Sequence, residues 1–303
     1  MDSSRQREAF STDVLQAAPY PVAIIGAGAL GLSLASRLIR SGPVALVASN
    51  ADAAQRLRAG VRVGAVVERF DGFAAPRLPR ADWVVVVVKA GGTRDALRSA
   101  LAMRPRGVLS LQNGLLDLEP AGTGTCVAQG VTTMGAFRTD EGVMPVSDGE
   151  TLMPQGFEPL AALFQQAGLP ARIEVAMQAA RLAKLLVNVV LNPLTAVFRV
   201  RTGELLAAPY MNHVEALVAE AWPVLRAAGL MLEFDEARAK VWSVVRSTAD
   251  NRTSMLQDVL AGRRTEREAI TGAFLRLADG NGAAVPTHRA LHTLLGQIDA
   301  DRC

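Results

Sequence analysis

The sequence contains little cysteine and few aromatic residues. Its 303 residues include two cysteines, Cys126 and Cys303, and aromatic residues make up 5%. Two cysteines so far apart provide neither a disulfide framework nor a metal cluster, so no metal site is predicted. This usage favours a reducing, cytoplasmic setting.

Dense basic blocks and long uninterrupted apolar runs are also missing. The 32 basic and 29 acidic residues give a net charge of +3, and the basic residues are spread along the chain, which argues against nucleic acid as a partner. The most apolar stretch, residues 182–198, contains Lys184 and a proline, so we expect a buried helix and no membrane partner. Residues 1–19 are polar, lack the apolar core of a signal peptide, and are predicted to be a flexible tail.

The first half of the chain alternates short apolar runs with helical patterns. Continuous Val and Ile runs without polar alternation are typical of strands buried on both faces. Together with the predicted helix at 29–41, they favour a doubly wound parallel sheet. The runs lie at 21–25, 44–48, 83–88 and 108–111.

The pattern changes after residue 124. Short segments at 126–133, 142–146 and 151–153 are predicted to be antiparallel strands added at the sheet edge, followed by a helix at 158–166 and a strand at 171–175. From residue 176 onward only helices are predicted, at 179–199, 204–228, 233–248 and 267–279. The predicted fold is therefore α/β, with an N-terminal Rossmann-like doubly wound sheet over 20–175 and an all-α C-terminal domain over 176–303.

A glycine-rich turn separates the first predicted strand from the first helix. Gly26, Gly28 and Gly31 have the spacing G-x-G-x-x-G. The first glycine suits a tight turn, the second admits a pyrophosphate, and the third allows the helix to pack on the strand. The helix N-terminus adds free N–H groups for the phosphates. We predict a dinucleotide site; FAD and an unrelated glycine-rich turn remain alternatives for the motif alone.

The end of the second apolar run bears on the choice of dinucleotide. NAD-binding chains usually carry an acid there, which binds the ribose hydroxyls. Here Ser49 and Asn50 follow the run, and both can donate hydrogen bonds to a 2′-phosphate, which favours NADP(H). The alternative is that Asp52 binds the ribose hydroxyls of NAD.

Only three of the basic residues are lysines, and two of them accompany apolar runs. Lys89 ends the valine run at 83–88, where a cation can meet cofactor phosphate or ribose; the alternative is a solvated lysine. Lys184, Asn188 and Asn192 are spaced four residues apart and form one polar stripe on a helix. A buried ammonium requires an acceptor, and a carbonyl substrate would supply one; the alternative is a polar seam between helices.

Histidine chemistry is not predicted. His213, His288 and His292 all fall in the predicted helical half, where we expect them on helix surfaces. None accompanies the lysine stripe.

Taken in order, these motifs and several others resemble those of the ketopantoate reductases (2-dehydropantoate 2-reductases), over nearly all of 20–297. The matching segments are 26–31 (GAGALG), 88–90 (VKA), 111–114 (LQNG), 184–196 with its Asn-Pro-Leu-Thr-Ala end, 253–258 (TSMLQD), 264–266 (RTE) and 286–287 (PT).

The resemblance implies a reaction and roles for particular residues. NADPH would transfer a hydride to the ketone of a 2-oxo acid substrate, making pantoate in pantothenate biosynthesis. Lys184 matches the proton donor, and Glu266 matches the acid beside it and the nicotinamide ribose. Asn188, Asn192 and Ser254 match substrate-binding groups. The matching cofactor contacts are Gly26, Ala27, Gly28, Ala29, Leu30, Gly31, Ser49, Lys89, Asn113, Ala136 and Glu266. A homodimer is also expected.

Alternatives stay open at this point. Without the resemblance, Glu266 would be expected to pair with Arg263 or Arg264. The chain departs from the family at Ser49, where an arginine is usual, and at Thr202, where an asparagine is usual. A reductase of a different 2-oxo acid or an imine, and a non-catalytic dinucleotide sensor, are therefore the competing hypotheses.

Overall fold

The chain divides into two compact units. The computed structural model describes residues 18–116, 118 and 124–301, so most of the predicted flexible tail and Cys303 lie outside the described residues. The first unit comprises Met1–Gln112 and Leu118–Ile173, and the second comprises Asn113–Asp117 and Glu174–Cys303. A short segment after Gln112 therefore belongs to the second unit.

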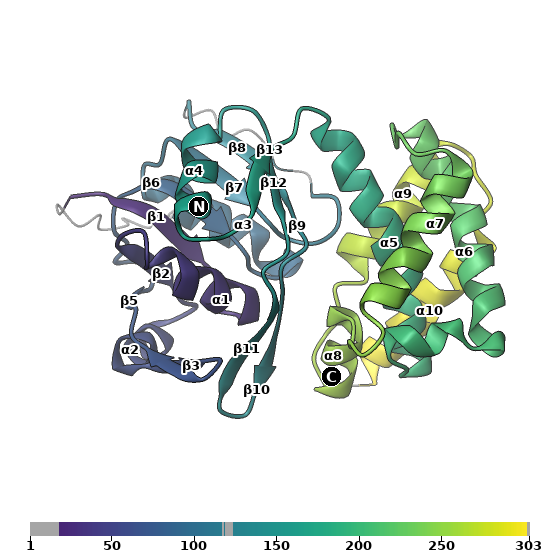
Figure 1. Cartoon of the computed structure of the whole chain (residues 1–303), viewed down its shortest axis with the longest axis horizontal. Helices are drawn as coiled ribbons and strands as arrows, with labels where there is room; N and C mark the ends of the chain where they lie inside the picture. The colour runs from purple at the N-terminus through teal and green to yellow at the C-terminus, as the bar shows by residue number, and fades with distance from the viewer. Residues whose placement is uncertain (1–17, 117, 119–123, 302–303) are drawn as a thin grey trace, which may run out of the picture. The chain divides into compact units, whose positions relative to one another are not determined.

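The first unit is built on a six-stranded sheet in which all neighbouring strands run parallel (Figure 1). Its order is β5-β2-β1-β6-β7-β8, the doubly wound order in which chain direction reverses beside the first strand. The strands are β1 (Tyr20–Ile25), β2 (Val44–Val47), β5 (Asp71–Phe73), β6 (Ala81–Val86), β7 (Gly107–Ser110) and β8 (Cys126–Gln129).

Helices follow β1, β2 and β6, and the central strands of the sheet are buried. The four residues of β2 and the last four of both β1 and β6 are buried, which explains their unbroken apolar composition. The connecting helices are α1 (Ala29–Leu38), α2 (Ala51–Ala59) and α3 (Thr93–Ala102), with a 3₁₀ turn, η1, at Ala90–Gly92. The predicted fold class is confirmed for this unit.

Two smaller sheets complete the first unit, and they correct part of the prediction. The segment 126–133 was expected to be antiparallel; its second part, β9, pairs antiparallel with β12, but its first part, β8, pairs parallel with β7. The antiparallel pair β10 and β11 belongs to a separate sheet of order β10-β11-β3-β4, and β13-β12-β9 forms a third. Their bounds are β3 (Val61–Val63), β4 (Val66–Glu68), β9 (Val131–Thr132), β10 (Gly135–Thr139), β11 (Gly142–Ser147), β12 (Thr151–Met153) and β13 (Ala171–Ile173), with α4 at Glu158–Gln166.

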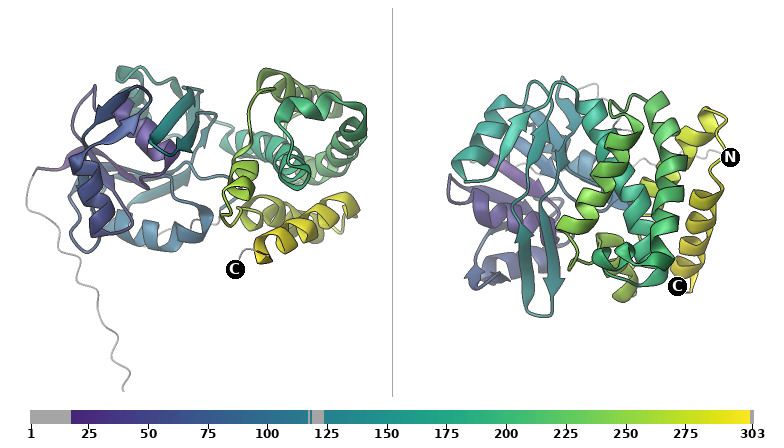
Figure 2. Two further views of the ribbon diagram at one scale, coloured as in Figure 1. Left: turned by 90° about the horizontal axis from the view of Figure 1, so that it is seen from below. Right: turned by 45° about the vertical axis from the view of Figure 1, so that its right-hand side comes forward.

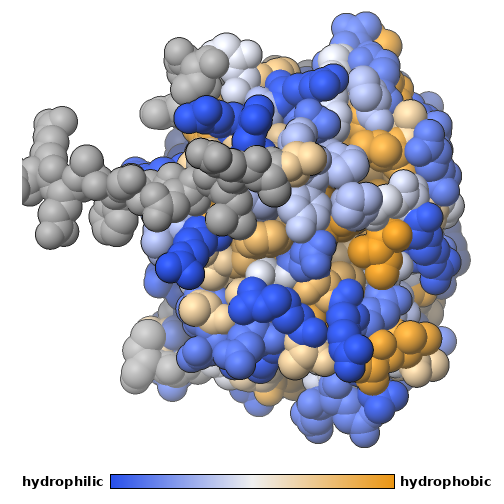
Figure 3. Space-filling view, turned by 90° about the vertical axis from the view of Figure 1, so that its left-hand side faces the viewer, coloured by the Kyte–Doolittle hydropathy of each residue, from blue (hydrophilic) through white to orange (hydrophobic). Residues whose placement is uncertain are grey.

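Figure 3 looks onto the first unit, where apolar residues lie in separate patches among hydrophilic ones. Scattered apolar surface of this kind is normal for a folded domain.

All regular secondary-structure elements among the described residues of the second unit are helices (Figures 1 and 2). Its longest helix, α5, packs against α6, α7, α8 and α10. The elements are α5 (Met177–Phe198), η2 (Thr202–Leu206), α6 (Ala208–Ala227), α7 (Phe234–Ser247), α8 (Ser254–Leu260), the π-helix η3 (Glu268–Gly272), α9 (Ala273–Gly280) and α10 (Pro286–Ala300). By length and composition α5 would span a membrane, but 61% of its most apolar window is buried inside the protein, as in a core helix.

The glycine-rich turn between β1 and α1 has a steric reason for glycine at two of its three glycine positions. Gly26 has φ +118°, and a Cβ there would lie 3.0 Å from the backbone of Val87 and Val88. A Cβ at Gly31 would lie 1.9 Å from the carbonyl oxygen of Gly26. Gly28 differs from both, because a Cβ added there would have no atom within 4 Å.

These environments predict different effects on stability for two alanine substitutions. Gly31→Ala should lower the free energy of unfolding by about 1–3 kcal/mol, because the new methyl group overlaps a backbone oxygen that cannot move freely. Gly28→Ala should leave it within about 0.5 kcal/mol of the wild type. Urea denaturation measures both, and equal destabilisation by the two variants would contradict the steric account.

Candidate functional site

Three predicted cofactor-binding features, the glycine turn, Ser49 and Lys89, follow three neighbouring strands whose carboxyl ends are in register. Ile25 at the end of β1 is paired with Val47 at the end of β2 and with Val86 at the end of β6. The glycine turn begins at the next residue after β1, Ser49 follows β2 by two residues, and Lys89 follows β6 by three. The carboxyl edge beside such a chain reversal is where doubly wound folds bind ligands.

The path from β6 to Lys89 lies against the glycine turn. The strand ends at Val86, earlier than the predicted 88, and Val87 and Val88 form the backbone next to Gly26. Lys89 then precedes the 3₁₀ turn η1 as its N-cap residue. Lys89 therefore directly follows the two residues whose backbone contacts Gly26.

The turn itself fits the phosphates of a dinucleotide. The space beside Gly28 is open, so an anion can approach the backbone there. Gly28 is the N-cap of α1, and Ala29 and Leu30 are its first residues. The first N–H groups of a helix have no partner within the helix and, with the helix dipole, favour negative charge.

The end of β2 offers hydrogen-bond donors and one carboxylate. Ser49 is exposed. Asn50 caps α2, since its Oδ1 accepts a hydrogen bond of 2.8 Å from the Ala53 N–H, which leaves its NH₂ group as a donor. Asp52 is exposed in the first turn of α2.

The structure adds an arginine that the sequence pattern did not single out. Arg138 on β10 donates a hydrogen bond of 2.8 Å to the carbonyl oxygen of Ala27 in the glycine turn. The same strand carries Ala136, so this predicted cofactor residue belongs to a strand that reaches the turn. No local signal identifies Arg138, because its partner lies 111 residues away in sequence.

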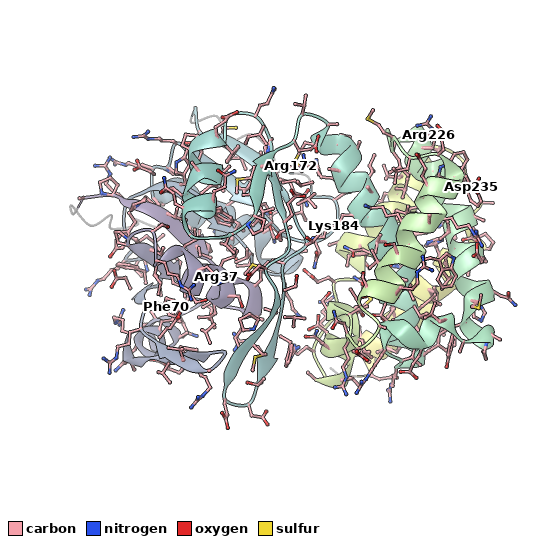
Figure 4. The ribbon with its side chains drawn as sticks, viewed as in Figure 1. Arg37, Phe70, Arg172, Lys184, Arg226 and Asp235 are labelled. Atoms are coloured by element: carbon pink, nitrogen blue, oxygen red, sulfur yellow. The ribbon has the colours of Figure 1, made fainter. Side chains whose placement is uncertain are left out.

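In the second unit, the predicted polar stripe lies on α5, and Figure 4 labels its first member, Lys184. Lys184 and Asn188 are half-buried, and Asn192 is 6% exposed. Burial lowers the pKa of Lys184 from 10.5 to about 8, against an opposing effect of the Glu266 carboxylate, which raises it. An amine with this pKa exchanges its proton near neutral pH.

Glu266, which precedes the π-helix η3, lies beside both Lys184 and Asn113. The Asn113 Nδ2 donates a hydrogen bond of 3.5 Å to Glu266 Oε2. The next residue, Gly114, has φ +84°, and a Cβ there would lie 1.9 Å from the Ala269 carbonyl oxygen, so the asparagine loop packs directly on η3. Single π-helical turns inside helices often occur at functional sites. Arg263, which with Arg264 was an alternative partner for Glu266, forms a salt bridge of 3.0 Å with Asp258.

Ser254 is the first residue of α8 and lies near the other end of the stripe. The N-cap of α8, Thr253, forms a 2.6 Å hydrogen bond with Thr195 of α5, hydroxyl to hydroxyl. Thr195 is one turn beyond Asn192. The two helices therefore bring Ser254 and Asn192 to the same region of the unit.

Asp299, near the end of α10, holds the residues on both sides of Glu266. It is 8% exposed and accepts hydrogen bonds from the Thr265 N–H at 3.0 Å and the Thr265 hydroxyl at 2.8 Å. It also pairs with the Arg267 guanidinium at 3.5 Å. Because Thr265 and Arg267 are both fixed, the backbone of Glu266 has little freedom.

The histidines required one correction. His288 was expected on a helix surface, but it is fully buried, with its ring 4.4 Å from that of Phe274 and its Nδ1 2.9 Å from Glu220. It anchors the start of α10 and is absent from the interactions around Lys184. Thr202, the predicted departure in substrate binding, is 2% exposed and donates its hydroxyl to the Asn251 carbonyl at 3.2 Å.

Fold and site together are those of a dinucleotide-binding oxidoreductase: a glycine-rich turn at the end of the first strand of a doubly wound sheet, and a lysine of lowered pKa beside a carboxylate.

Comparisons with known proteins agree. Residues 22–155 match the family model described as Ketopantoate reductase PanE/ApbA, and residues 176–299 match its C-terminal counterpart. The 2-dehydropantoate 2-reductase of Archaeoglobus fulgidus is 31% identical over 291 residues, covering 92% of this chain and 98% of the relative. That of Bacillus subtilis is 31% identical over 277 residues, covering 86% and 91%.

Solved structures show the same fold. A probable 2-dehydropantoate 2-reductase from Bacillus subtilis has a TM-score of 0.78 at 29% identity, covering 91% of this chain and 99% of its own. A D-mandelate dehydrogenase with NADH has a TM-score of 0.82 at 22% identity, covering 93% and 100%, and this likeness concerns the fold alone. The chain belongs to the ketopantoate reductase family, which confirms the resemblance; it is an oxidoreductase of a family that reduces 2-oxo acids. The homodimer stays a prediction.

The contacts of Asp299 predict a large local contribution to stability. Asp299→Ala should lower the free energy of unfolding by about 1–3 kcal/mol, because it leaves the N–H and the hydroxyl of Thr265 without their acceptor and removes one of the two carboxylates that pair with Arg267. Asp301→Ala is the matched control at the same helix end, where the carboxylate is exposed, and should change the value by less than about 0.5 kcal/mol. Urea denaturation compares them, and similar midpoints for both variants would contradict the role given to Asp299.

Proposed function

We propose that the chain reduces ketopantoate to pantoate with NADPH, using Lys184 as the proton donor. The observation that carries this proposal is the group formed by Lys184, Glu266 and Asn113 in the second unit, with the lysine pKa lowered to about 8. A lysine that only formed a polar seam between helices would not require a carboxylate held in place by its neighbours. Membership of the ketopantoate reductase family supports the substrate class.

The proposed chemistry divides between the cofactor and the side chains. A bound NADPH supplies the hydride that adds to the ketone carbon. The Lys184 ammonium donates a hydrogen bond to the ketone oxygen and then gives it a proton, so that no alkoxide is left in a partly dry site. Glu266 keeps the lysine in its charged form, because a nearby opposite charge favours protonation. Asn188, Asn192 and Ser254 bind the carboxylate and the hydroxyl group of the substrate.

The proposed cofactor contacts lie at the carboxyl edge of the main sheet. The glycine turn and the start of α1 bind the pyrophosphate, with Lys89 and Ala136 nearby. Ser49 and the NH₂ group of Asn50 donate hydrogen bonds to the 2′-phosphate of NADPH. A carboxylate at the strand end would repel that phosphate, and the exposed Asp52 starts the following helix instead.

Replacing the proton donor should remove most of the activity. We expect Lys184→Ala to lower kcat by about 10²–10⁴-fold, the usual contribution of a positioned general acid. The matched control is Lys240→Ala, which removes an exposed lysine from α7 of the same unit and should leave kcat unchanged. NADPH oxidation with ketopantoate measures both, and a Lys184→Ala turnover close to wild type would exclude the proton-donor role.

The same lysine gives the pH dependence a definite sign. Because its pKa is lowered to about 8, the ammonium form is present below pH 8 and is lost as the pH rises. Ketone reduction should therefore slow above about pH 8, while oxidation of pantoate, which needs the neutral amine, should accelerate over the same range. A kcat for reduction that rises through pH 8 would contradict this assignment.

The cofactor preference can be separated from pyrophosphate binding by two variants. We expect wild-type kcat/KM to favour NADPH over NADH, and Ser49→Arg to increase that ratio by about tenfold, since a charge-assisted contact to phosphate is worth about 1.4 kcal/mol or more. Arg138→Met should raise KM for both dinucleotides alike, because the glycine turn that Arg138 contacts binds the pyrophosphate common to both. Wild-type preference for NADH would contradict the assignment of Ser49 and Asn50.

A further inference from the structure

Arg181, on the first turns of α5, is a cation without an evident structural purpose. It is half-buried, and its Nε is buried without a hydrogen-bond partner in the described part of the chain. Burial also lowers its pKa. Taking a guanidinium out of water costs free energy unless an anion or a set of acceptors replaces the lost hydration. The side chain is therefore suited to a ligand that brings negative charge.

Arg181 extends the polar stripe of α5 beyond Lys184. With 3.6 residues per turn, it lies about 20° around the helix axis from both Asn188 and Asn192, and about 60° from Lys184. Along the axis it stands about 4.5 Å before Lys184, whereas the two asparagines come after it. Arg181 and the asparagines therefore occupy opposite ends of one face, with Lys184 between them.

The end of the stripe remote from Arg181 is the one that meets α8. The hydroxyl contact between Thr195 and Thr253 places Ser254 at that end. Ser254 and Asn192 are among the groups proposed above to bind the substrate's oxygen atoms, and we place the carboxylate adjoining the ketone at this end, with the ketone oxygen facing Lys184. The rest of the substrate then extends toward Arg181.

We propose that Arg181 binds a second carboxylate at the far end of the substrate, so that the chain also reduces 2-oxo dicarboxylic acids. The inference rests on the proposed function, because it takes the ketone position from Lys184. The step is the same: a hydride from NADPH adds to C2, a proton from Lys184 adds to the oxygen, and a 2-hydroxy diacid and NADP⁺ are formed. Both carboxylates remain unchanged.

Two substrates of equal chain length test the proposal. 2-Oxoglutarate and 2-oxopentanoate differ only in the terminal carboxylate, so the ratio of their kcat/KM values reports that group alone. We expect the wild type to prefer 2-oxoglutarate and Arg181→Met to lower the ratio by about 10–100-fold, the usual range for a hydrogen bond to a charged group. Arg181→Lys should restore part of the ratio, since it keeps the charge without the planar fork.

A matched arginine and a stability measurement complete the design. Arg226→Met removes a guanidinium that lies well away from Lys184 in Figure 4 and donates instead to Leu230 and Glu233; its ratio should equal that of the wild type. In thermal denaturation without ligands, Arg181→Met should unfold at a higher temperature than wild type, because a costly buried cation has been replaced by an apolar chain. A lower unfolding temperature would show that Arg181 serves the fold and would overturn the proposal.

The kinetic outcomes separate the two levels of inference. An unchanged substrate ratio in Arg181→Met overturns the second-carboxylate site, and so does an equal loss with both substrates, which would place Arg181 on the carboxylate beside the ketone. Reduction of ketopantoate without preference for 2-oxoglutarate overturns this inference alone. If the wild type oxidises NADPH with neither ketopantoate nor either 2-oxo acid, the proposed function itself fails.

Discussion

The second unit is organised around one electrostatic constraint, the half-buried ammonium group of Lys184 opposite the carboxylate of Glu266. Burial alone would favour the neutral amine, and the carboxylate opposes that effect, leaving a pKa of about 8. This balance requires Glu266 to stay in place although it lies outside regular helix. Asp299 fixes the residues on either side of it, and the Asn113 loop packs on the π-helix that follows. The site therefore depends on segments from four separate parts of the sequence.

The first unit depends on a different constraint, the close packing of backbone at the glycine-rich turn. Gly26 and Gly31 are required by contacts inside the protein, whereas Gly28 borders open space. Gly26 and Gly31 make the turn possible, and the space beside Gly28 is open. The three glycines of the motif are therefore not equivalent: two are required by packing and one is not.

Features with short-range causes could be predicted from the sequence. The glycine turn is a local motif, and the Lys184, Asn188 and Asn192 stripe follows from helical spacing. The parallel sheet followed from its valine-rich runs. The short strands β3, β4 and β5 carry no comparable run, and the partner of β8 could not be told from its own residues, so its parallel pairing was missed.

Features made by distant residues escaped prediction for the same reason. Arg138 meets Ala27 across 111 residues, Asp299 meets Thr265 across 34, and His288 is buried through a partner 68 residues away. Arg181 lies on the predicted helix, but only the lack of a partner for its buried Nε distinguishes it from the other arginines. Periodicity places such a side chain on a face; it does not reveal what satisfies its charge.

The balance at Lys184 can be observed directly, because the chain has only three lysines. In protein labelled with ¹³C at lysine Cε, the signal absent from Lys184→Arg identifies this residue, and its chemical shift can be followed by NMR from pH 6 to 11. The account predicts a midpoint near pH 8, and a lower midpoint in Glu266→Gln, since the carboxylate raises the lysine pKa. A midpoint near 10.5 in the wild type, unaffected by Glu266→Gln, would contradict it.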